Sequence, residues 1–212
     1  MHKRKIQIKV CGITDVSEVL ALNELEVEYA GFIFAKSPRQ VSWKKAVELA
    51  NAADKKLKIV GVFSDVDPEF INGLHSDGII DIVQLHTQDL SRVREINAMV
   101  WASVPVSGVG RILEKVNPFI AGVHLDTFDK KLKGGTGRTF NWEAAGGFET
   151  DKMLILAGGL SYENVREALG YIKADVVDLN SGAEIIRDGI RNKEPKLIRK
   201  FIEEVREYEK HE

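Results

Sequence analysis

The chain has 212 residues, with 44% hydrophobic and 29% charged side chains, a formal net charge of −2 and a pI of about 6.2. This composition is typical of a globular protein with a sizeable core. The 30 basic and 32 acidic residues are interspersed, so we expect no nucleic-acid partner. The sequence shows neither the roughly 20 apolar residues of a membrane helix nor a signal-like segment after its basic start, and one cysteine cannot form an internal disulfide. We therefore expect a cytoplasmic protein that contacts no membrane.

Short apolar segments alternate with helical patterns along the chain. The first half predicts, in order, a strand at 5–11, a helix at 15–26, a strand at 29–34, a helix at 43–53, a strand at 57–63 and a helix at 68–74. The second half continues with a strand at 80–86, a helix at 90–96, a strand at 99–104, a helix at 109–116, a strand at 120–126 and a short helix near Asn141. A strand at 153–156, a helix at 162–171, a strand at 174–179 and a helix from Pro195 complete the chain.

Eight strands alternating with eight helical segments, without a break in composition, predict one domain over residues 1–212. We expect a closed (β/α)8 barrel, the TIM barrel, whose usual length fits this chain. An open doubly wound sheet is the alternative. We prefer the closed ring because polar residues end the first, fourth, sixth and eighth strands, and a ring brings those four ends to one mouth.

Those polar residues stand out because strands of an all-parallel sheet are normally apolar on both faces. Counted by twos, they share one face of each strand: Lys9 with Cys11, Gln84 with His86, His124 with Asp126, and Asp178 with Asn180. We expect them inside the barrel, near its C-terminal mouth. Each could instead be a satisfied polar group of the core, which is the simpler interpretation for His86 or His124 taken alone.

Cys11 is the only thiol, and it ends the first strand directly before Gly12. A lone cysteine usually behaves as a small buried hydrophobe, so its neighbours must decide whether it does chemistry. Gly12 has no Cβ, which allows a sharp turn and a close approach of a ligand.

Three glycine-bearing loops follow the sixth, seventh and eighth strands. They are Gly134-Gly135-Thr136-Gly137, Ala157-Gly158-Gly159 and Asn180-Ser181-Gly182. Backbone N–H groups of such loops can face an anion, and barrels often bind phosphate in this half of the ring, although glycine also serves tight turns alone. We expect a small phosphorylated substrate. No Gly-Lys-Ser/Thr follows the first loop, so we infer no nucleotide.

The chain resembles the phosphoribosylanthranilate isomerase family of tryptophan biosynthesis nearly from end to end. The resemblance rests on Lys9-Val10-Cys11-Gly12-Ile13, Gly31-Phe32-Ile33-Phe34, Ser37-Pro38-Arg39, Val83-Gln84-Leu85-His86, Leu125-Asp126-Thr127, Gly134-Gly135-Thr136-Gly137, Phe140-Asn141-Trp142, Ala157-Gly158-Gly159-Leu160, Glu163-Asn164-Val165 and Asn180-Ser181-Gly182.

The resemblance implies an Amadori rearrangement of N-(5-phosphoribosyl)anthranilate to 1-(2-carboxyphenylamino)-1-deoxyribulose 5-phosphate, without cofactor or metal. It implies that Asp126 is the general acid and Cys11 the general base. Cys11 must then be a thiolate, and Lys9 is expected to lower its pKa. Asp126 must stay protonated, which burial or Asp178 would favour.

The remaining site residues have binding or supporting roles. Arg39 is expected to hold the anthranilate carboxylate. The residues expected to bind the phosphorylated substrate are Gly135, Gly158, Gly159, Asn180, Ser181 and Gly182. Gln84 and His86 join Lys9 and Asp178 as supporting groups. Each helix has one apolar stripe, so we expect a monomer.

Three departures from the family pattern and two rival functions remain. Thr87 stands where the family usually has glycine, and the fifth strand has Ala102 near its end, where a lysine is common. The stretch 183–189 differs from the usual Gly-Val-Glu followed by Pro-Gly. The sister isomerase of histidine biosynthesis should have aspartates on the first and fifth strands and a duplicated half-barrel, which we do not find in the sequence. A phosphate-binding barrel without turnover, acting as an interaction module, is disfavoured by the intact Cys11 and Asp126.

Overall fold

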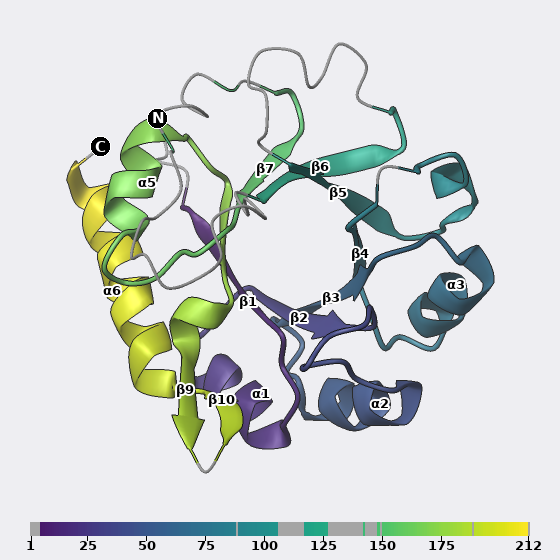
Figure 1. Cartoon of the computed structure of the whole chain (residues 1–212), viewed down its shortest axis with the longest axis horizontal. Coiled ribbons are helices and arrows are strands. Elements are labelled where there is room, and N and C mark those ends of the chain that lie inside the picture. The colour runs from purple at the N-terminus through teal and green to yellow at the C-terminus, as the bar shows by residue number, and fades with distance from the viewer. Residues whose placement is uncertain are drawn as a thin grey trace.

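The computed structural model describes residues 5–87, 89–105, 117–126, 142, 148, 150–187 and 189–211. Eight parallel strands form a closed barrel in sequence order, which Figure 1 shows end on with the helices outside. The strands are β1 (Gln7–Cys11), β2 (Tyr29–Ile33), β3 (Lys58–Phe63), β4 (Ile82–Leu85), β5 (Met99–Pro105), β6 (Ile120–Asp126), β7 (Met153–Leu156) and β8 (Val176–Leu179). Pairing of β1 with β8 closes the ring. The expected barrel is therefore confirmed, and the open sheet is wrong.

The helices that the structure describes pack around the barrel. They are α1 (Val16–Glu24), α2 (Trp43–Ala52), α3 (Pro68–Ser76), α5 (Val165–Tyr171) and α6 (Pro195–His211). Local sequence sets where they begin: Asp15 caps α1 in a capping box with Glu18, and Asp67 caps α3 ahead of Pro68. None of these helices combines the length and hydrophobicity that crossing a membrane requires.

Two helix predictions were too long. The segment 90–96 forms only the 3-10 turn η1 (Val93–Glu95), because its apolar residues Leu90, Val93 and Ile96 recur every third position, which suits a 3-10 turn. The helix expected at 162–171 begins at Val165, after a turn in which Asn164 Oδ1 accepts the Ser161 N–H. The helix expected at 109–116 lies outside the described residues, as does the one near Asn141 apart from the buried Trp142.

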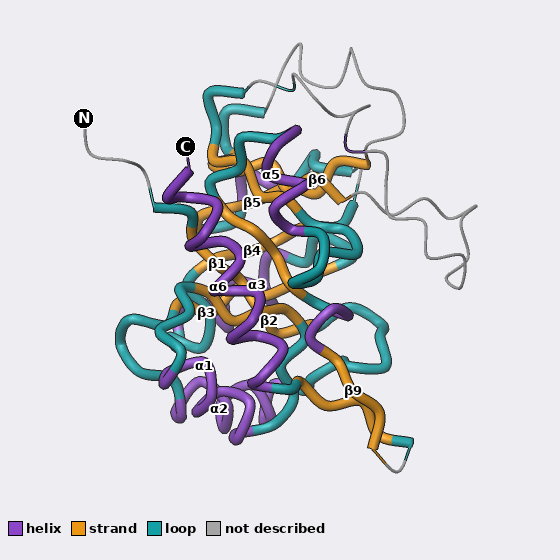
Figure 2. The backbone as a smooth tube through the Cα atoms, turned by 90° about the vertical axis from the view of Figure 1, so that its left-hand side faces the viewer, coloured by secondary structure: helices purple, strands orange, loops and turns teal. Residues whose placement is uncertain are grey.

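A hairpin between β8 and α6 was not expected. After the 3-10 turn η2 (Ser181–Ala183), strands β9 (Glu184–Arg187) and β10 (Ile190–Lys193) pair antiparallel around Gly189, whose φ is +77°. The hairpin projects from the barrel in both views (Figures 1 and 2). Its last residue, Lys193, is nevertheless buried, so the base of the hairpin belongs to the mouth of the barrel.

Strand register determines which side chains point into the barrel. Lys9 pairs with Asp178 and Cys11 with Gly31, and residues paired in a parallel sheet lie on the same face. An apolar cluster formed by Tyr29, Val60, Ile82, Trp101, Ile155 and Val176 fills the part of the interior toward the N-terminal ends of the strands. The polar residues predicted to share this face follow in register toward the C-terminal ends.

Candidate active site

A buried charged group lies at the centre of the barrel mouth. The Lys9 ammonium Nζ is 2.6 Å from Asp178 Oδ2, and His124 Nε2 is 2.9 Å from the same oxygen. The side chains of Lys9 and Asp178 are 0% and 5% exposed, and Ser103 Oγ contacts the other nitrogen of His124 at 3.2 Å. The predicted polar ends of β1, β6 and β8 therefore meet inside the barrel.

The pairing keeps both ions charged. Burial alone would favour neutral Asp178, but Lys9 and the hydrogen bond from His124 outweigh it and hold the pKa of this carboxyl far below its usual range. Burial likewise opposes the charge of Lys9, yet Asp178 and Cys11 raise its pKa above the ordinary lysine value. Asp178 Oδ1 and Gln84 Oε1 are buried without a hydrogen-bond partner among the described residues, and both are acceptors that a ligand hydroxyl can use.

Cys11 is packed tightly at the end of β1. It is 5% exposed and clusters with Ile33 and Val62, and a Cβ added to Gly31 would lie 2.8 Å from its Sγ. Burial raises the pKa of the Cys11 thiol, while the charges of Lys9 and Lys193 lower it. Lys9 therefore acts in the expected direction, but burial dominates and the net change in the Cys11 pKa is upward.

His86 and Asp126 form the more accessible part of the site. Their side chains are 34% and 33% exposed, and His86 Nδ1 lies 4.0 Å from Asp126 Oδ2. Gln84 Nε2 contacts His86 Nε2 at 2.6 Å, and the rings of His86 and His124 are 5.4 Å apart. Burial, followed by His124 and Lys9, lowers the pKa of His86 to about 3, so it is neutral at physiological pH. Of the two features expected to favour protonated Asp126, its burial is only partial, and Asp178 is bound to Lys9 and His124.

The loops after β7 and β8 contact each other. Gly158 and Gly159 have φ values of +89° and +68°, a backbone region that suits glycine. A Cβ on Gly182 would lie 2.1 Å from the carbonyl oxygen of Leu160, so only glycine lets the two loops approach this closely. Gly158, Gly159, Asn180, Ser181 and Gly182 thus lie on two adjoining loops, whereas Gly135 lies outside the described residues.

Arg39 is a buried structural link as the structure stands. Its guanidinium donates to the Gly12 carbonyl, to Arg191 O at 2.7 Å, to Thr14 Oγ1 at 3.2 Å and to Glu18 Oε1 at 2.6 Å. These contacts tie the loop after β1 to α1 and β10. The role expected for Arg39 at the substrate carboxylate stays a prediction, and it requires some of these hydrogen bonds to be exchanged.

Sequence reasoning predicted Asn180 as a site residue but missed Lys193, Glu184 and Glu18. Lys193 Nζ donates to Asn180 Oδ1 at 2.8 Å and to Glu184 Oε1 at 3.2 Å, while its backbone N–H donates to Glu18 Oε1 at 2.8 Å. In the sequence Lys193, Glu184 and Glu18 resemble ordinary polar residues of the surface. The only local signal was the capping box that places Glu18 at the start of α1, next to the site.

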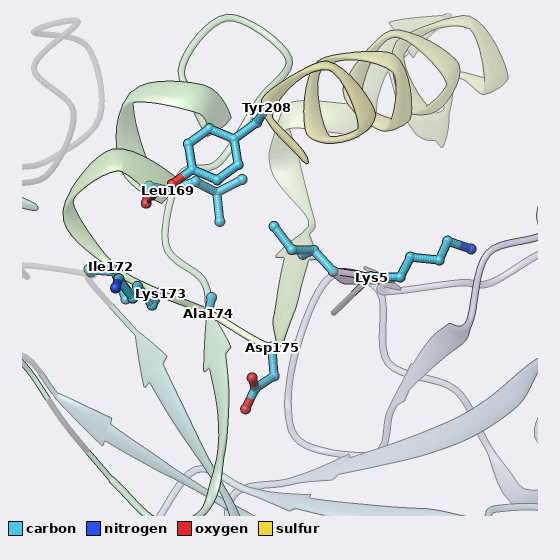
Figure 3. A pocket seen from close by; sticks show the side chains of 8 residues that line it. Lys5, Leu169, Ile172, Lys173, Ala174, Asp175 and Tyr208 are labelled. Carbon is cyan, nitrogen blue, oxygen red and sulfur yellow. Dashed lines mark hydrogen bonds between the residues drawn. The ribbon is translucent and has the colours of Figure 1, made fainter. Parts of the chain in front are cut away.

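A hollow lies at the end of the barrel opposite the polar mouth. Figure 3 shows this cavity of about 240 Å³, next to the residues that precede β1 and β8. It is lined by Lys5, Ile6, Leu169, Ile172, Lys173, Ala174, Asp175 and Tyr208. The Tyr208 hydroxyl is used internally, since it donates to the Leu169 carbonyl at 2.9 Å. Enzymes with this fold place their chemistry at the C-terminal ends of the strands, so we assign the active site to the polar mouth.

A closed parallel barrel with acid–base side chains at the C-terminal ends of β1, β4, β6 and β8 defines a (β/α)8-barrel enzyme. The family model described as N-(5'-phosphoribosyl)anthranilate (PRA) isomerase matches residues 8–204. The chain therefore belongs to the N-(5'-phosphoribosyl)anthranilate isomerase family, whose members act in tryptophan biosynthesis, and it is an isomerase.

Similar proteins and structures agree with this assignment. N-(5'-phosphoribosyl)anthranilate isomerases of Thermoanaerobacter sp. and Clostridium acetobutylicum are both 36% identical, over 95% and 96% of this chain and 98% and 99% of theirs. The Thermotoga maritima phosphoribosylanthranilate isomerase structure is 27% identical with a TM-score of 0.78, covering 95% of this chain and 99% of its own. Another T. maritima structure, 28% identical with a TM-score of 0.75 and the same coverage, is described as monomers of a dimeric enzyme. Our expectation of a monomer thus remains a prediction.

Proposed function

We propose that this enzyme converts N-(5'-phosphoribosyl)anthranilate to 1-(2-carboxyphenylamino)-1-deoxyribulose 5-phosphate, with Asp126 as general acid and Cys11 as general base. The observation that carries the proposal is the common inward face that these residues share with Lys9, Asp178 and His124 at the C-terminal ends of β1, β6 and β8. A related structure, 28% identical with a TM-score of 0.77, contains the reduced form of this product.

The reaction needs two proton transfers that these side chains can perform. Asp126 gives its proton to the ribose ring oxygen as the bond from that oxygen to C1 breaks, and the nitrogen lone pair forms a C1=N iminium. The Cys11 thiolate then removes the proton from C2, so that the C2–H electron pair forms C1=C2 and the iminium electrons return to nitrogen. The resulting enol gains a proton at C1 and loses one from its oxygen to give the ketone.

The partial exposure of Asp126 and the burial of Cys11 suit this order of events. Asp126 can meet the incoming sugar, because a third of its side chain is accessible. The unliganded Cys11 is mostly protonated, since burial raises its pKa. The iminium formed in the first step carries a positive charge beside Cys11, which favours the thiolate when it is needed. The neutral His86 near Asp126 adds no competing positive charge.

The adjoining loops after β7 and β8 are our candidate phosphate seat. Gly158 and Gly159 have positive φ values, and the close contact of Gly182 with Leu160 holds the two loops in one arrangement, so an anion can approach the glycine backbone closely. Asn180 and Ser181 add polar side chains at the same end of β8. The predicted contribution of Gly135 concerns a loop outside the described residues.

The test combines three variants with two measurements. Turnover is followed by the fluorescence change as N-(5'-phosphoribosyl)anthranilate is consumed, and affinity by titration with the reduced product. We expect Cys11→Ala, Cys11→Ser and Asp126→Asn to lose at least about 100-fold in kcat while binding the reduced product within a few fold of the parent. Retained turnover in Cys11→Ala would refute the base assignment. Failure of the parent enzyme to consume the substrate would favour the histidine-pathway isomerase or the non-catalytic barrel.

A further inference from the structure

Lys193, at the base of the β9–β10 hairpin, is a buried cation that the mechanism above does not use. Its side chain is 1% exposed, and Nζ donates to Asn180 O at 2.9 Å, Asn180 Oδ1 at 2.8 Å and Glu184 Oε1 at 3.2 Å. A lysine ammonium has three N–H donors, and each of them has an acceptor here. The geometry is therefore that of the charged form.

The amide of Asn180 connects Lys193 to the end of β1. Gly12 follows Cys11 and has a φ of +79°, and a Cβ added to it would lie 3.3 Å from Asn180 Oδ1. The same oxygen accepts the hydrogen bond from Lys193. The side chain of Asn180 therefore lies between the buried charge of Lys193 and the backbone of Gly12, the residue that follows Cys11.

The charged groups facing Cys11 come from three strands. Lys9 on β1 favours the thiolate but is paired with Asp178 on β8 at 2.6 Å, and Asp178 itself opposes the thiolate. Lys193 on β10 also favours the thiolate. Lys9 and Asp178 act on Cys11 in opposite directions and partly offset each other, and Lys193 adds to the effect of Lys9.

The negative charge beside Lys193 is shared. Glu184 Oε1 lies 3.2 Å from Lys193 Nζ and 3.9 Å from Arg39 Nε, and Glu184 Oε2 lies 3.1 Å from Arg191. Glu18 is occupied by Arg39 and by the backbone N–H of Lys193. Because the Glu184 carboxylate is shared by Lys193, Arg39 and Arg191, it offsets only part of the Lys193 charge.

We propose that Lys193 is a positioning residue for the isomerisation: its ammonium holds Asn180 at the end of β8 and supplies the positive charge that stabilises the Cys11 thiolate. The proposal rests on the role of Cys11 as base. It also gives the β9–β10 hairpin a function, since the last residue of the hairpin, Lys193, places its charge at the mouth of the barrel.

The test reads the ionisation of Cys11 directly, because it is the only cysteine in the chain. Ultraviolet thiolate absorbance is titrated against pH, and the Cys11→Ser variant provides the tyrosine background. We expect Lys193→Met to raise the pKa of Cys11 by about one unit, and Lys193→Arg to keep it near the parent value. Glu184→Gln should lower it, because the amide still accepts a hydrogen bond but no longer offsets the charge. Lys56→Met, in an exposed pair with Glu26, is the control without a change.

Lys193→Met and Glu184→Gln should shift the pKa of Cys11 in opposite directions. A merely structural role cannot explain this result, because loss of structure would shift that pKa in the same direction in both variants. An unchanged Cys11 pKa in folded Lys193→Met would overturn the proposal. If that variant does not fold, Glu184→Gln decides, and an unchanged or raised Cys11 pKa there overturns it. The titration does not depend on catalysis, so a failure of Cys11 as base, seen as turnover in Cys11→Ala, is recognised separately.

Discussion

Replacing Lys9 by Met would test whether the charged group in the barrel mouth is a coupled unit. The change removes the cation 2.6 Å from Asp178 and leaves a carboxylate that is 5% exposed, to which only His124 donates among the described residues. Breaking a buried ion pair on one side costs about 3–5 kcal/mol, because the remaining charge stays desolvated. We expect Lys9→Met to lower the free energy of unfolding by that amount.

The assay is urea unfolding at neutral pH in a double-mutant cycle. The double variant Lys9→Met with Asp178→Asn should recover at least half of the loss, since neither partner is then charged. The exposed pair of Lys58 and Asp81, 2.9 Å apart with side chains 51% and 39% accessible, is the matched control. Its cycle should give about 0.2–1 kcal/mol. A cost below about 1 kcal/mol for Lys9→Met, or strict additivity in the double variant, would refute the coupling.

The same pair predicts how stability depends on pH. The pKa of Asp178 is lower in the folded protein than in the unfolded chain, so its contribution is present above the unfolded value of about 3.9 and is lost as pH falls toward the folded value. The pKa of Lys9 is raised, so its contribution is present below about 10.4 and is lost as pH rises through the folded value. Lys9→Met should therefore flatten the acid limb of the stability curve relative to the parent.

Three further predictions follow from single contacts. Because burial raises the pKa of the Cys11 thiol, the pH profile of kcat/KM should change slope at an ionisation above the ordinary thiol value of about 8.5, and a profile without an ionisation in that range would contradict Cys11 as the base. Gly182→Ala must separate the loops after β7 and β8, so we expect a raised KM for the substrate at similar kcat. In Gly159→Ala the added methyl group meets open space, so the variant should lose only about 1–2 kcal/mol of folding stability, the cost of a left-handed backbone for alanine. Arg39→Lys should lower the free energy of unfolding in urea by about 3 kcal/mol, because one ammonium cannot replace the contacts to Gly12 and Glu18. An unchanged urea midpoint with a raised KM would instead favour the role of Arg39 at the substrate carboxylate.

The barrel could be predicted because its signals are local and repeated. The strands at 120–126 and 153–156 were predicted with the bounds that the structure gives, since each is a short apolar run between turn residues. Polar residues at every second position near the strand ends identified the inward face. That inference holds without knowing any contact, because side chains alternate strictly along a strand.

The contacts within the mouth could not be predicted in the same way. Which partner Lys9 would choose depends on the register of β1 against β8, and these strands are about 170 residues apart in sequence. The hairpin at β9 and β10 has a weak local pattern, since Ile186 and Ile190 are exposed and pack against no core. Lys193 became recognisable only through long-range contacts with Asn180 and Glu18.

The exposure of the polar side chains in the barrel rises from the inner to the outer groups, and the two sets differ in what they can do. Lys9 and Asp178 are the most buried and fix each other's charge, which means that neither can gain or lose a proton near neutral pH. Asp126 and His86, about one third exposed, lie where a substrate can reach them. Cys11 is buried like the first pair, and the charge of Lys9 also acts on its thiol. The inner pair therefore keeps a constant charge near neutral pH, and the proposed proton transfers involve the outer groups and Cys11.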